Sequence, residues 1–172
     1  MSRTLPVTAC TAALLLCAGT ASAKDLTVTL ELPRLNVAEY HRPYLAIWVE
    51  RGDQSVAANL ALWYEIKNKN HEKWVADLRQ WWRRSGRDQT LPVDGITGAT
   101  RPAGQYQLVY AADKAPLAKL APGRYQLVVE AVREVGGREV LKVPFEWPVT
   151  AAATASAKGS TELAAVKVDL NP

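Results

Sequence analysis

Two strands and the turn between them are visible in Gly123-Arg-Tyr-Gln-Leu-Val-Val-Glu-Ala-Val-Arg-Glu-Val-Gly-Gly-Arg-Glu-Val-Leu-Lys-Val-Pro-Phe-Glu-Trp147. Apolar and polar residues alternate on both sides of Gly136-Gly137. A glycine pair between two alternating segments favours a two-residue β-hairpin, here joining strands over residues 123–134 and 138–149. The second strand contains two prolines, which cannot donate a backbone hydrogen bond, so we expect it to be bulged or at a sheet edge.

Three more strands are predicted near the start of the domain. Residues 25–32 alternate between apolar and polar side chains, as a strand with one buried face does. At residues 44–50, Leu45, Ile47 and Val49 can point to one face of a second strand and Ala46 and Trp48 to the other, and residues 51–54 form a tight connection to a return strand at 56–64. The sequence therefore begins with antiparallel β-structure.

Short strands are also predicted later in the chain. Proline and glycine precede an alternating Tyr-containing segment twice, at residues 102–109 and 122–128, and we expect these segments to be neighbouring strands. Residues 151–161 have no period and predict a mobile loop, whereas residues 163–170 predict a final strand. These features predict a mainly β fold: an antiparallel, immunoglobulin-like β-sandwich with one amphipathic α-helix.

That one helix is predicted from about His71 to Arg84, with Asn70 as its N-cap and Gly86 following its last turn. Its apolar side chains recur at helical spacing and define one stripe that packs on the sheet. The stripe is predicted to contain Trp74, Leu78 and Trp81, widened by Val75 and Trp82.

The N-terminal residues are typical of a secretory signal peptide. Residues 1–23 contain Arg3, an apolar segment and a final Ala-Ser-Ala, so we expect export to the periplasm and cleavage before Lys24. Residues 24–172 are then one β-sandwich domain. Both cysteines, Cys10 and Cys17, fall within the signal, so the domain is predicted to fold without a disulfide.

Several kinds of chemistry lack their sequence signatures. The net charge of +4 is mild and indicates no nucleic-acid partner. His41 and His71 are the only histidines and are too far apart in sequence for a local ligand pair, so we predict no metal site. Neither a Gly-x-Ser-x-Gly elbow nor a glycine-rich phosphate loop is present, and we assign no catalytic residue.

A small-residue segment stands out between the predicted helix and the following strand. It reads Asp94-Gly-Ile-Thr-Gly-Ala-Thr100 and is followed by Arg101. Glycines and a nearby proline indicate a surface turn with accessible hydroxyls on Thr97 and Thr100. The plainer interpretation is a Gly/Thr turn that joins two strands and has no chemical role.

This segment resembles the acceptor motif Asp-x-x-(Ser/Thr)-Gly-Ala-Thr, which a periplasmic flavin transferase modifies in FMN-carrying subunits of sodium-pumping NADH:quinone reductase. The resemblance implies that Thr100 carries covalent FMN through a phosphoester bond, with Asp94, Thr97, Gly98 and Ala99 forming the rest of the motif. Residues 41–50, 73–82 and 133–134 also resemble a bacterial family of small secreted domains of unknown function in which the motif recurs.

The resemblance implies a redox carrier more than a stand-alone catalyst. Its partners would be the flavin transferase and membrane or periplasmic redox proteins. On this interpretation Arg101 neutralises the phosphodiester charge, or is simply a solvated turn residue. Trp81 or Trp82 would stack on the flavin, with core packing as the alternative for both.

A second function remains open at this point. A secreted immunoglobulin-like domain without a cofactor would use exposed aromatic side chains to bind a protein or glycan. The candidates for such a surface are Trp48, Trp63, Tyr64 and Trp147.

Overall fold

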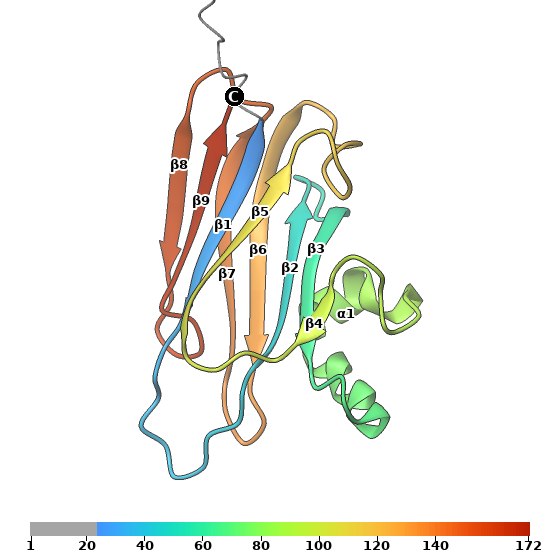
Figure 1. The fold of residues 1–172 in the computed structure, drawn as a ribbon, viewed down its shortest axis with the longest axis vertical. Coiled ribbons are helices and arrows are strands. Elements are labelled where there is room, and N and C mark those ends of the chain that lie inside the picture. The colour runs from blue at the N-terminus through green and yellow to red at the C-terminus, as the bar shows by residue number, and fades with distance from the viewer. Residues whose placement is uncertain (1–23) are drawn as a thin grey trace, which may run out of the picture.

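In the computed structural model, which describes residues 24–172, two β-sheets pack face to face (Figure 1). The four-stranded sheet has the order β5-β1-β9-β8 and the five-stranded sheet the order β4-β3-β2-β6-β7. The predicted signal peptide, residues 1–23, lies outside the described residues. The strands are β1 (Asp25–Leu32), β2 (Tyr44–Glu50), β3 (Val56–Tyr64), β4 (Thr97–Ala99), β5 (Gly104–Ala111), β6 (Gly123–Val132), β7 (Arg138–Trp147), β8 (Ala153–Lys158) and β9 (Ala165–Asn171).

The predicted mainly β sandwich is confirmed. Strands β1, β2 and β3 have the predicted bounds, and β7 lies at an edge of its sheet, as its prolines indicated. Neighbouring strands are antiparallel except β3 and β4, which run parallel. The main core fills the space between the sheets and includes Leu30, Ile47, Leu127 and Val168, all fully buried.

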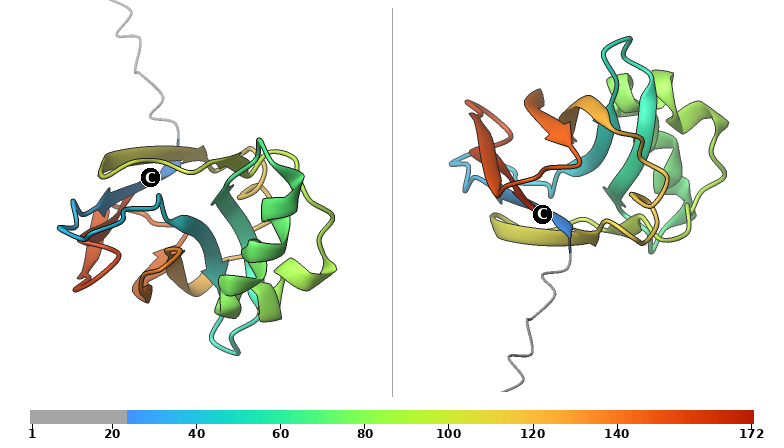
Figure 2. Two further views of the ribbon diagram at one scale, coloured as in Figure 1. Left: turned by 90° about the horizontal axis from the view of Figure 1, so that it is seen from below. Right: turned by 90° about the horizontal axis from the view of Figure 1, so that it is seen from above.

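A helical layer covers the outer face of the five-stranded sheet (Figure 2). It consists of the 3₁₀ helix η1 (Lys69–Asp77), the short α-helix α1 (Arg79–Arg84) and the 3₁₀ turn η2 (Gly86–Asp88). Val75, Leu78 and Trp81 from this layer pack on the sheet around Trp48 and Tyr64. The five-stranded sheet is therefore buried on both faces.

The predicted single α-helix from His71 to Arg84 is wrong in its form. Its first part is a 3₁₀ helix whose N-cap is Asn68, not Asn70, since the Asn68 side chain accepts the Asn70 N–H at 3.0 Å. A 3₁₀ helix places residues i and i+3 above one another, because it has three residues per turn. The buried stripe is consequently Val75, Leu78 and Trp81, and Trp74 falls outside it.

A buried carboxylate from the sheet fixes the start of α1. Glu130 on β6 is fully buried and accepts the backbone N–H groups of Gln80 at 3.1 Å and Trp81 at 2.8 Å. Arg138 on β7 completes the arrangement, with its Nε 2.6 Å from Glu130 Oε1. A carboxylate at the first helical N–H groups replaces the missing side-chain cap of Leu78.

Gly86 follows α1 as predicted, but not for the predicted reason. Among the described glycines only Gly95 and Gly104 have a left-handed φ, so Gly86 does not end the helix by a left-handed turn. A Cβ at residue 86 would lie 2.7 Å from Trp81 Cε3 and 2.9 Å from Trp82 Cε3. Glycine is required here because two indole rings pack on its backbone.

Two other predicted connections are corrected. The β6–β7 hairpin does not turn at Gly136-Gly137 alone: residues 133–137 form the connection, closed by Arg133 N–H donating to the Gly137 carbonyl at 3.0 Å. Residues 151–161 are not a mobile loop, since β8 lies among them and pairs with β9. Its inward side chains are those of Ala155 and Ala157, which are too small to produce a clear apolar–polar alternation in the sequence.

The two Pro-Gly-Tyr segments form the same local structure in different sheets. Tyr106 donates its hydroxyl to the Pro102 carbonyl, and Tyr125 donates to the Ala121 carbonyl, each at 2.7 Å. Such tyrosine corners, which bond back to the chain upstream, are a feature of immunoglobulin-like sandwiches. The prediction that the two strands are neighbours is wrong, because β5 and β6 belong to different sheets.

Candidate functional site

The small-residue motif is a turn at residues 94–96, with Asp94 exposed, followed by a short strand of the five-stranded sheet. Residues 97–99 form β4, which pairs with β3 from Leu62 to Tyr64. Leu62 N–H donates to the Ile96 carbonyl at 2.8 Å, and Thr100 N–H donates to the Tyr64 carbonyl at 3.2 Å. Thr100 is only 9% exposed, so the expectation of a freely accessible hydroxyl is corrected.

Thr100 nevertheless lines a pocket. Its hydroxyl makes no hydrogen bond to the described residues. Among these residues the fully enclosed polar side-chain atoms without a partner are Gln126 Oε1 and Arg133 Nη1, so the Thr100 oxygen is not sealed from solvent.

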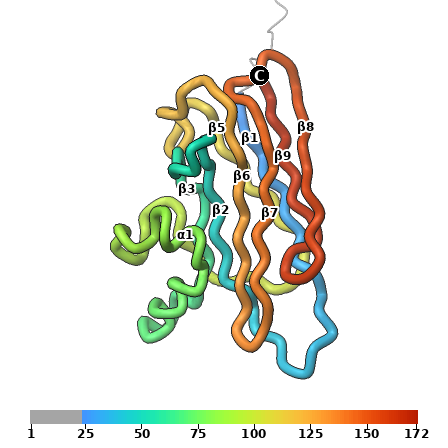
Figure 3. Tube along the Cα trace, turned by 180° about the vertical axis from the view of Figure 1, so that it is seen from behind, coloured from blue at the N-terminus to red at the C-terminus, as the bar shows by residue number. Residues whose placement is uncertain are grey.

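This cavity, which we call the Thr100 pocket, has a volume of about 460 Å³. Four segments that are distant in sequence build it: the loop before β2, the end of β3 with η1, the residue after β4, and the β6–β7 turn. Figures 1 and 3 show the loop before β2 and the β6–β7 turn at the same end of the sandwich. Its volume lies within the range typical of small-molecule sites.

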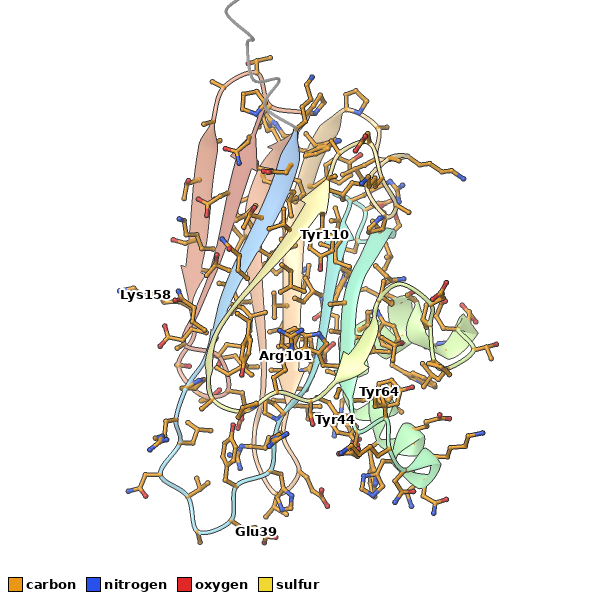
Figure 4. The ribbon with its side chains drawn as sticks, in the orientation of Figure 1. Glu39, Tyr44, Tyr64, Arg101, Tyr110 and Lys158 are labelled. Atoms are coloured by element: carbon orange, nitrogen blue, oxygen red, sulfur yellow. The ribbon has the colours of Figure 1, made fainter. Side chains whose placement is uncertain are left out.

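Aromatic rings form a large part of the pocket wall. Tyr40 comes from the loop, Tyr44 from β2 and Trp74 from η1. Trp74 is 45% exposed and Tyr40 38% exposed, while Tyr44 meets the buried Tyr64 edge to face with ring centroids 6.4 Å apart (Figure 4). Burial raises the pKa of both the Tyr40 and Tyr44 phenols, so both rings remain neutral and can donate a hydrogen bond.

Basic groups line the pocket beside these rings. Arg42 forms no ion pair with the described residues. Arg133 is held by Glu162 through two contacts, Nε–Oε2 at 3.0 Å and Nη2–Oε1 at 3.1 Å. His41 contacts two carboxylates, with Nε2 2.9 Å from Glu39 and Nδ1 3.6 Å from Glu134. Among the described residues, Arg42 is thus the cation of the wall that has no carboxylate partner.

Acidic groups and one strained residue complete the rim. The carboxylates of Glu65, Asp77 and Glu134 line the pocket, and so does His71. Val135, in the β6–β7 turn, has φ = 52° and is 78% exposed. A β-branched residue rarely adopts this left-handed backbone, and such strain tends to occur at functional sites.

Arg101 lies at a different place from Thr100. Its guanidinium stacks 4.1 Å from the Trp63 ring centroid and 5.0 Å from that of Tyr106. It lines a shallower groove of about 300 Å³, between β3 and β5, and does not line the Thr100 pocket. Figure 4 shows Arg101 toward the middle of the sandwich, away from Tyr44 and Tyr64. A role for Arg101 beside the Thr100 oxygen therefore has no support in this arrangement.

The other motif residues shape the segment that carries Thr100. Thr97 accepts the Val93 N–H through its hydroxyl at 2.8 Å and donates its own N–H to the Val93 carbonyl. A Cβ at Gly98 would lie 3.3 Å from Trp63 Cδ1, so the close approach to β3 favours glycine. Asp94 and Ala99 are exposed. The motif thus forms a tight turn and a short strand.

The predicted flavin neighbours Trp81 and Trp82 do not lie in the Thr100 pocket. Trp81 is fully buried, and its Nε1 donates to Asn59 Oδ1 at 2.8 Å. Trp82 packs against the same helical-layer core and is half-buried. The core-packing interpretation therefore fits both, and Trp74 is the tryptophan of the pocket.

The aromatic surface suggested for a binding module is absent from the described residues. Trp48, Trp63, Tyr64 and Trp147 are between 0% and 6% exposed, so none of these candidates offers a surface to a partner. These four aromatic side chains belong to strands and pack inside the domain. Sequence pattern alone cannot separate them from exposed aromatic residues, because strands β2, β3 and β6 are covered on both faces and read as continuous apolar runs.

Four lining residues were not predicted as site residues from the sequence: Tyr40, Trp74, Arg42 and Arg133. A signal for them was present, because three of the stretches on which the resemblance rests, at residues 41–50, 73–82 and 133–134, meet at this pocket. The distances between these stretches along the sequence do not predict that they meet, because the pairing of β2 with β3 and β6 brings them together.

Two searches over residues 24–172 complete the description of the site. They contain no group of three or more His, Cys, Asp or Glu arranged to hold a metal ion. Within the same residues, none of the helices has the length and apolar character needed to cross a bilayer.

The fold and the site define a two-sheet β-sandwich domain with a lateral helical layer and one aromatic-lined pocket at an end of the sheets. The chain belongs to the family described as "Predicted periplasmic protein (DUF2271)", whose sequence model matches residues 25–165. The match covers most of the domain and accords with the periplasmic location expected from the sequence. No curated protein and no solved structure matches the chain.

Proposed function

We propose that this protein is a periplasmic flavoprotein that carries electrons on FMN attached covalently to Thr100. The observation that carries the proposal is the position of Thr100, the last residue of the acceptor-like motif, in the wall of a pocket lined by aromatic and basic side chains and by three carboxylates. A motif match alone does not explain such a pocket. The presence of a pocket at the residue that would carry the tether is what favours the cofactor proposal.

The residues present fit the cofactor by their chemistry. The rings of Tyr40, Tyr44 and Trp74 suit a flat tricyclic ring, and the free guanidinium of Arg42 suits a phosphodiester. FMN, when bound, supplies the exchange of one or two electrons. The protein orients the ring, limits its contact with water and holds it through one bond in place of a deep nucleotide fold.

Attachment is the work of a flavin transferase. The Thr100 oxygen forms a new bond to the riboflavin-side phosphorus of FAD, the bond between the two phosphates breaks, and AMP leaves. The hydroxyl proton passes to a base of the transferase. No redox change occurs in this step, and the only group this chain contributes is the Thr100 hydroxyl.

Access of the transferase requires β4 to leave β3. This strand is three residues long, and its parallel pairing is flanked by the two hydrogen bonds at Leu62 and Thr100. Each such bond contributes only about 1 kcal/mol net, so local release costs far less than unfolding the domain. Exposed Asp94 and left-handed Gly95 lie just before β4, where the segment would hinge.

The proposal is tested by co-expressing the chain with an active periplasmic flavin transferase and measuring the intact mass. We expect the mature mass plus one FMN moiety for the wild type and for Thr100→Ser, and the bare mass for Thr100→Ala. Thr90→Ala removes an exposed hydroxyl from the preceding loop and should keep the increment. An unmodified wild type, alongside a modified positive-control acceptor, contradicts the proposal.

A cofactor-free binding module is the second function that the sequence left open. Its proposed aromatic surface is buried, and no other observation favours it. The exposed aromatic side chains that do occur are those of the Thr100 pocket, which the flavin proposal explains.

A further inference from the structure

The distribution of exposed aromatic side chains is uneven in this protein. Among the described residues, the exposed large aromatics are Tyr40 and Trp74, and both line the Thr100 pocket. An exposed indole leaves a large apolar face in water, which is unfavourable unless a partner covers it. Two such rings facing one cavity indicate a ligand with a broad, flat, apolar surface.

The position of Trp74 is fixed by its neighbours and not by its own packing. Val75 and Leu78 are fully buried against the sheet and hold η1 in place. Trp74 belongs to neither core cluster, and Lys73 Nζ lies 4.9 Å from its ring centroid. The ring is thus presented to the pocket by a rigid backbone, as a stacking surface should be.

We infer that the Thr100 pocket binds the isoalloxazine ring of a flavin by itself, without the covalent bond, with Trp74 as the stacking face. The choice of ligand rests on the proposed function, whereas the binding does not require the tether. A flat ring against Trp74 would cover the exposed indole, and the neutral phenol of Tyr40 offers a hydrogen bond to its polar edge.

The phosphate end of the ligand has a separate contact. Arg42 lines the same pocket and has no carboxylate partner among the described residues, whereas Arg133 is paired with Glu162. A free guanidinium forms strong, charge-assisted bonds to phosphate. FMN should therefore bind more tightly than riboflavin, and this difference should depend on Arg42.

A modest intrinsic affinity is sufficient for this site. A short tether gives the attached ring an effective concentration in the millimolar range, so a dissociation constant near or below about 1 mM keeps the ring in the pocket most of the time. The unmodified chain should bind free riboflavin in the same range.

The test uses the full mature chain made without transferase, with riboflavin as the probe. Riboflavin is held at low concentration, the chain is raised to about 1 mM, and flavin fluorescence and anisotropy are followed. Wild type should quench riboflavin saturably, Trp74→Ala should weaken binding at least tenfold, and Trp74→Phe should restore part of it. Trp82→Ala, a tryptophan deletion from the same segment outside the pocket, should bind as wild type does.

The outcomes separate this inference from the proposed function. Covalent modification of Thr100 without riboflavin binding by the folded wild type overturns the inference and leaves the tether intact. Riboflavin binding without covalent modification supports the inference and rejects the tether. Equal binding by wild type and Trp74→Ala, with circular dichroism showing both folded, rejects Trp74 as the stacking face. Arg42→Gln should remove the preference for FMN over riboflavin, and an unchanged preference rejects that contact.

Discussion

Trp74 and Trp81 are seven residues apart in one segment and have opposite environments. Trp81 is fully buried, with its indole N–H bonded to Asn59, while Trp74 is 45% exposed at the Thr100 pocket. The break at Leu78 separates them, because the chain before it is a 3₁₀ helix and the chain after it an α-helix. The difference shows that a small change in helical period decides whether a tryptophan packs in the core or faces a pocket.

Removing each tryptophan in turn should produce the largest contrast. Trp81→Ala leaves a cavity in the helical-layer core and should lower the free energy of unfolding by about 3–5 kcal/mol. Trp74→Ala should lower it by about 1 kcal/mol or less, because the side chain is half in water. Urea unfolding of both variants checks this, and equal losses would mean that the two environments are wrongly assigned.

The anchor of α1 provides the next test of the comparison. Glu130→Gln places an amide where the carboxylate accepts the Gln80 and Trp81 N–H groups and pairs with Arg138. Loss of a buried charge with these partners should cost about 2–4 kcal/mol. Glu146→Gln, which removes an exposed partner of Arg124, should change unfolding by less than about 1 kcal/mol. Urea midpoints that move equally would contradict the anchoring role.

Adding a single methyl group should destabilise the fold at Gly86, beside Trp81, but not at Gly52. In Gly86→Ala the new Cβ meets the rings of Trp81 and Trp82, and such overpacking costs about 1–3 kcal/mol. Gly52→Ala meets no atom within 4 Å and serves as the matched control. Thermal unfolding measures both. A Gly86→Ala variant as stable as its control would show that the rings do not pack on this backbone.

The last comparison concerns Glu139 on β7, whose ionisation makes the stability of the fold depend on pH. Partial burial opposes ionisation of Glu139, but hydrogen bonds from the backbone of Leu163, Ser160 and Thr161 outweigh it and lower its pKa to about 2. The folded-state pKa lies below the usual value, so the stabilisation is present above about pH 4.5 and lost as the pH falls toward 2.

The corresponding variant should show the smallest effect. Glu139→Gln should cost about 1 kcal/mol at neutral pH, since the carboxylate bonds lie near the surface. Its loss of stability between pH 4.5 and pH 2 should be smaller than that of the wild type. Urea midpoints measured across this pH range check the sign, and parallel curves for the two proteins would exclude Glu139 as the titrating group.

Much of the sandwich was predictable from local pattern. The strand at residues 25–32 alternates because one face packs on the core, whereas those at 44–50 and 56–64 are nearly continuous apolar runs because both of their faces are buried. Residues 153–158 escaped prediction because alanine gives little contrast between the two faces of a strand. Prediction from local pattern failed where the side chains on the two faces of a strand differ little in size.

Of the residues predicted for the candidate site, Thr100 is the one that lines the pocket. The motif drew attention to this residue, but sequence neighbours were then taken as spatial neighbours, which failed for Arg101 and Trp81. The pocket partners come from residues 40–44, 71–77 and 132–135, which are joined by pairing of β2, β3 and β6. These residues come together through long-range strand pairing, which no local sequence pattern encodes.

The fluorescence of covalently attached flavin tests the central claim most directly. After co-expression with the transferase, equal amounts of modified wild type, Trp74→Ala and Trp82→Ala are compared, with intact mass confirming one FMN on each. A ring stacked on Trp74 is quenched, so we expect markedly brighter flavin in Trp74→Ala and unchanged flavin in Trp82→Ala. Equal brightness in all three proteins would contradict a flavin held in the Thr100 pocket against Trp74.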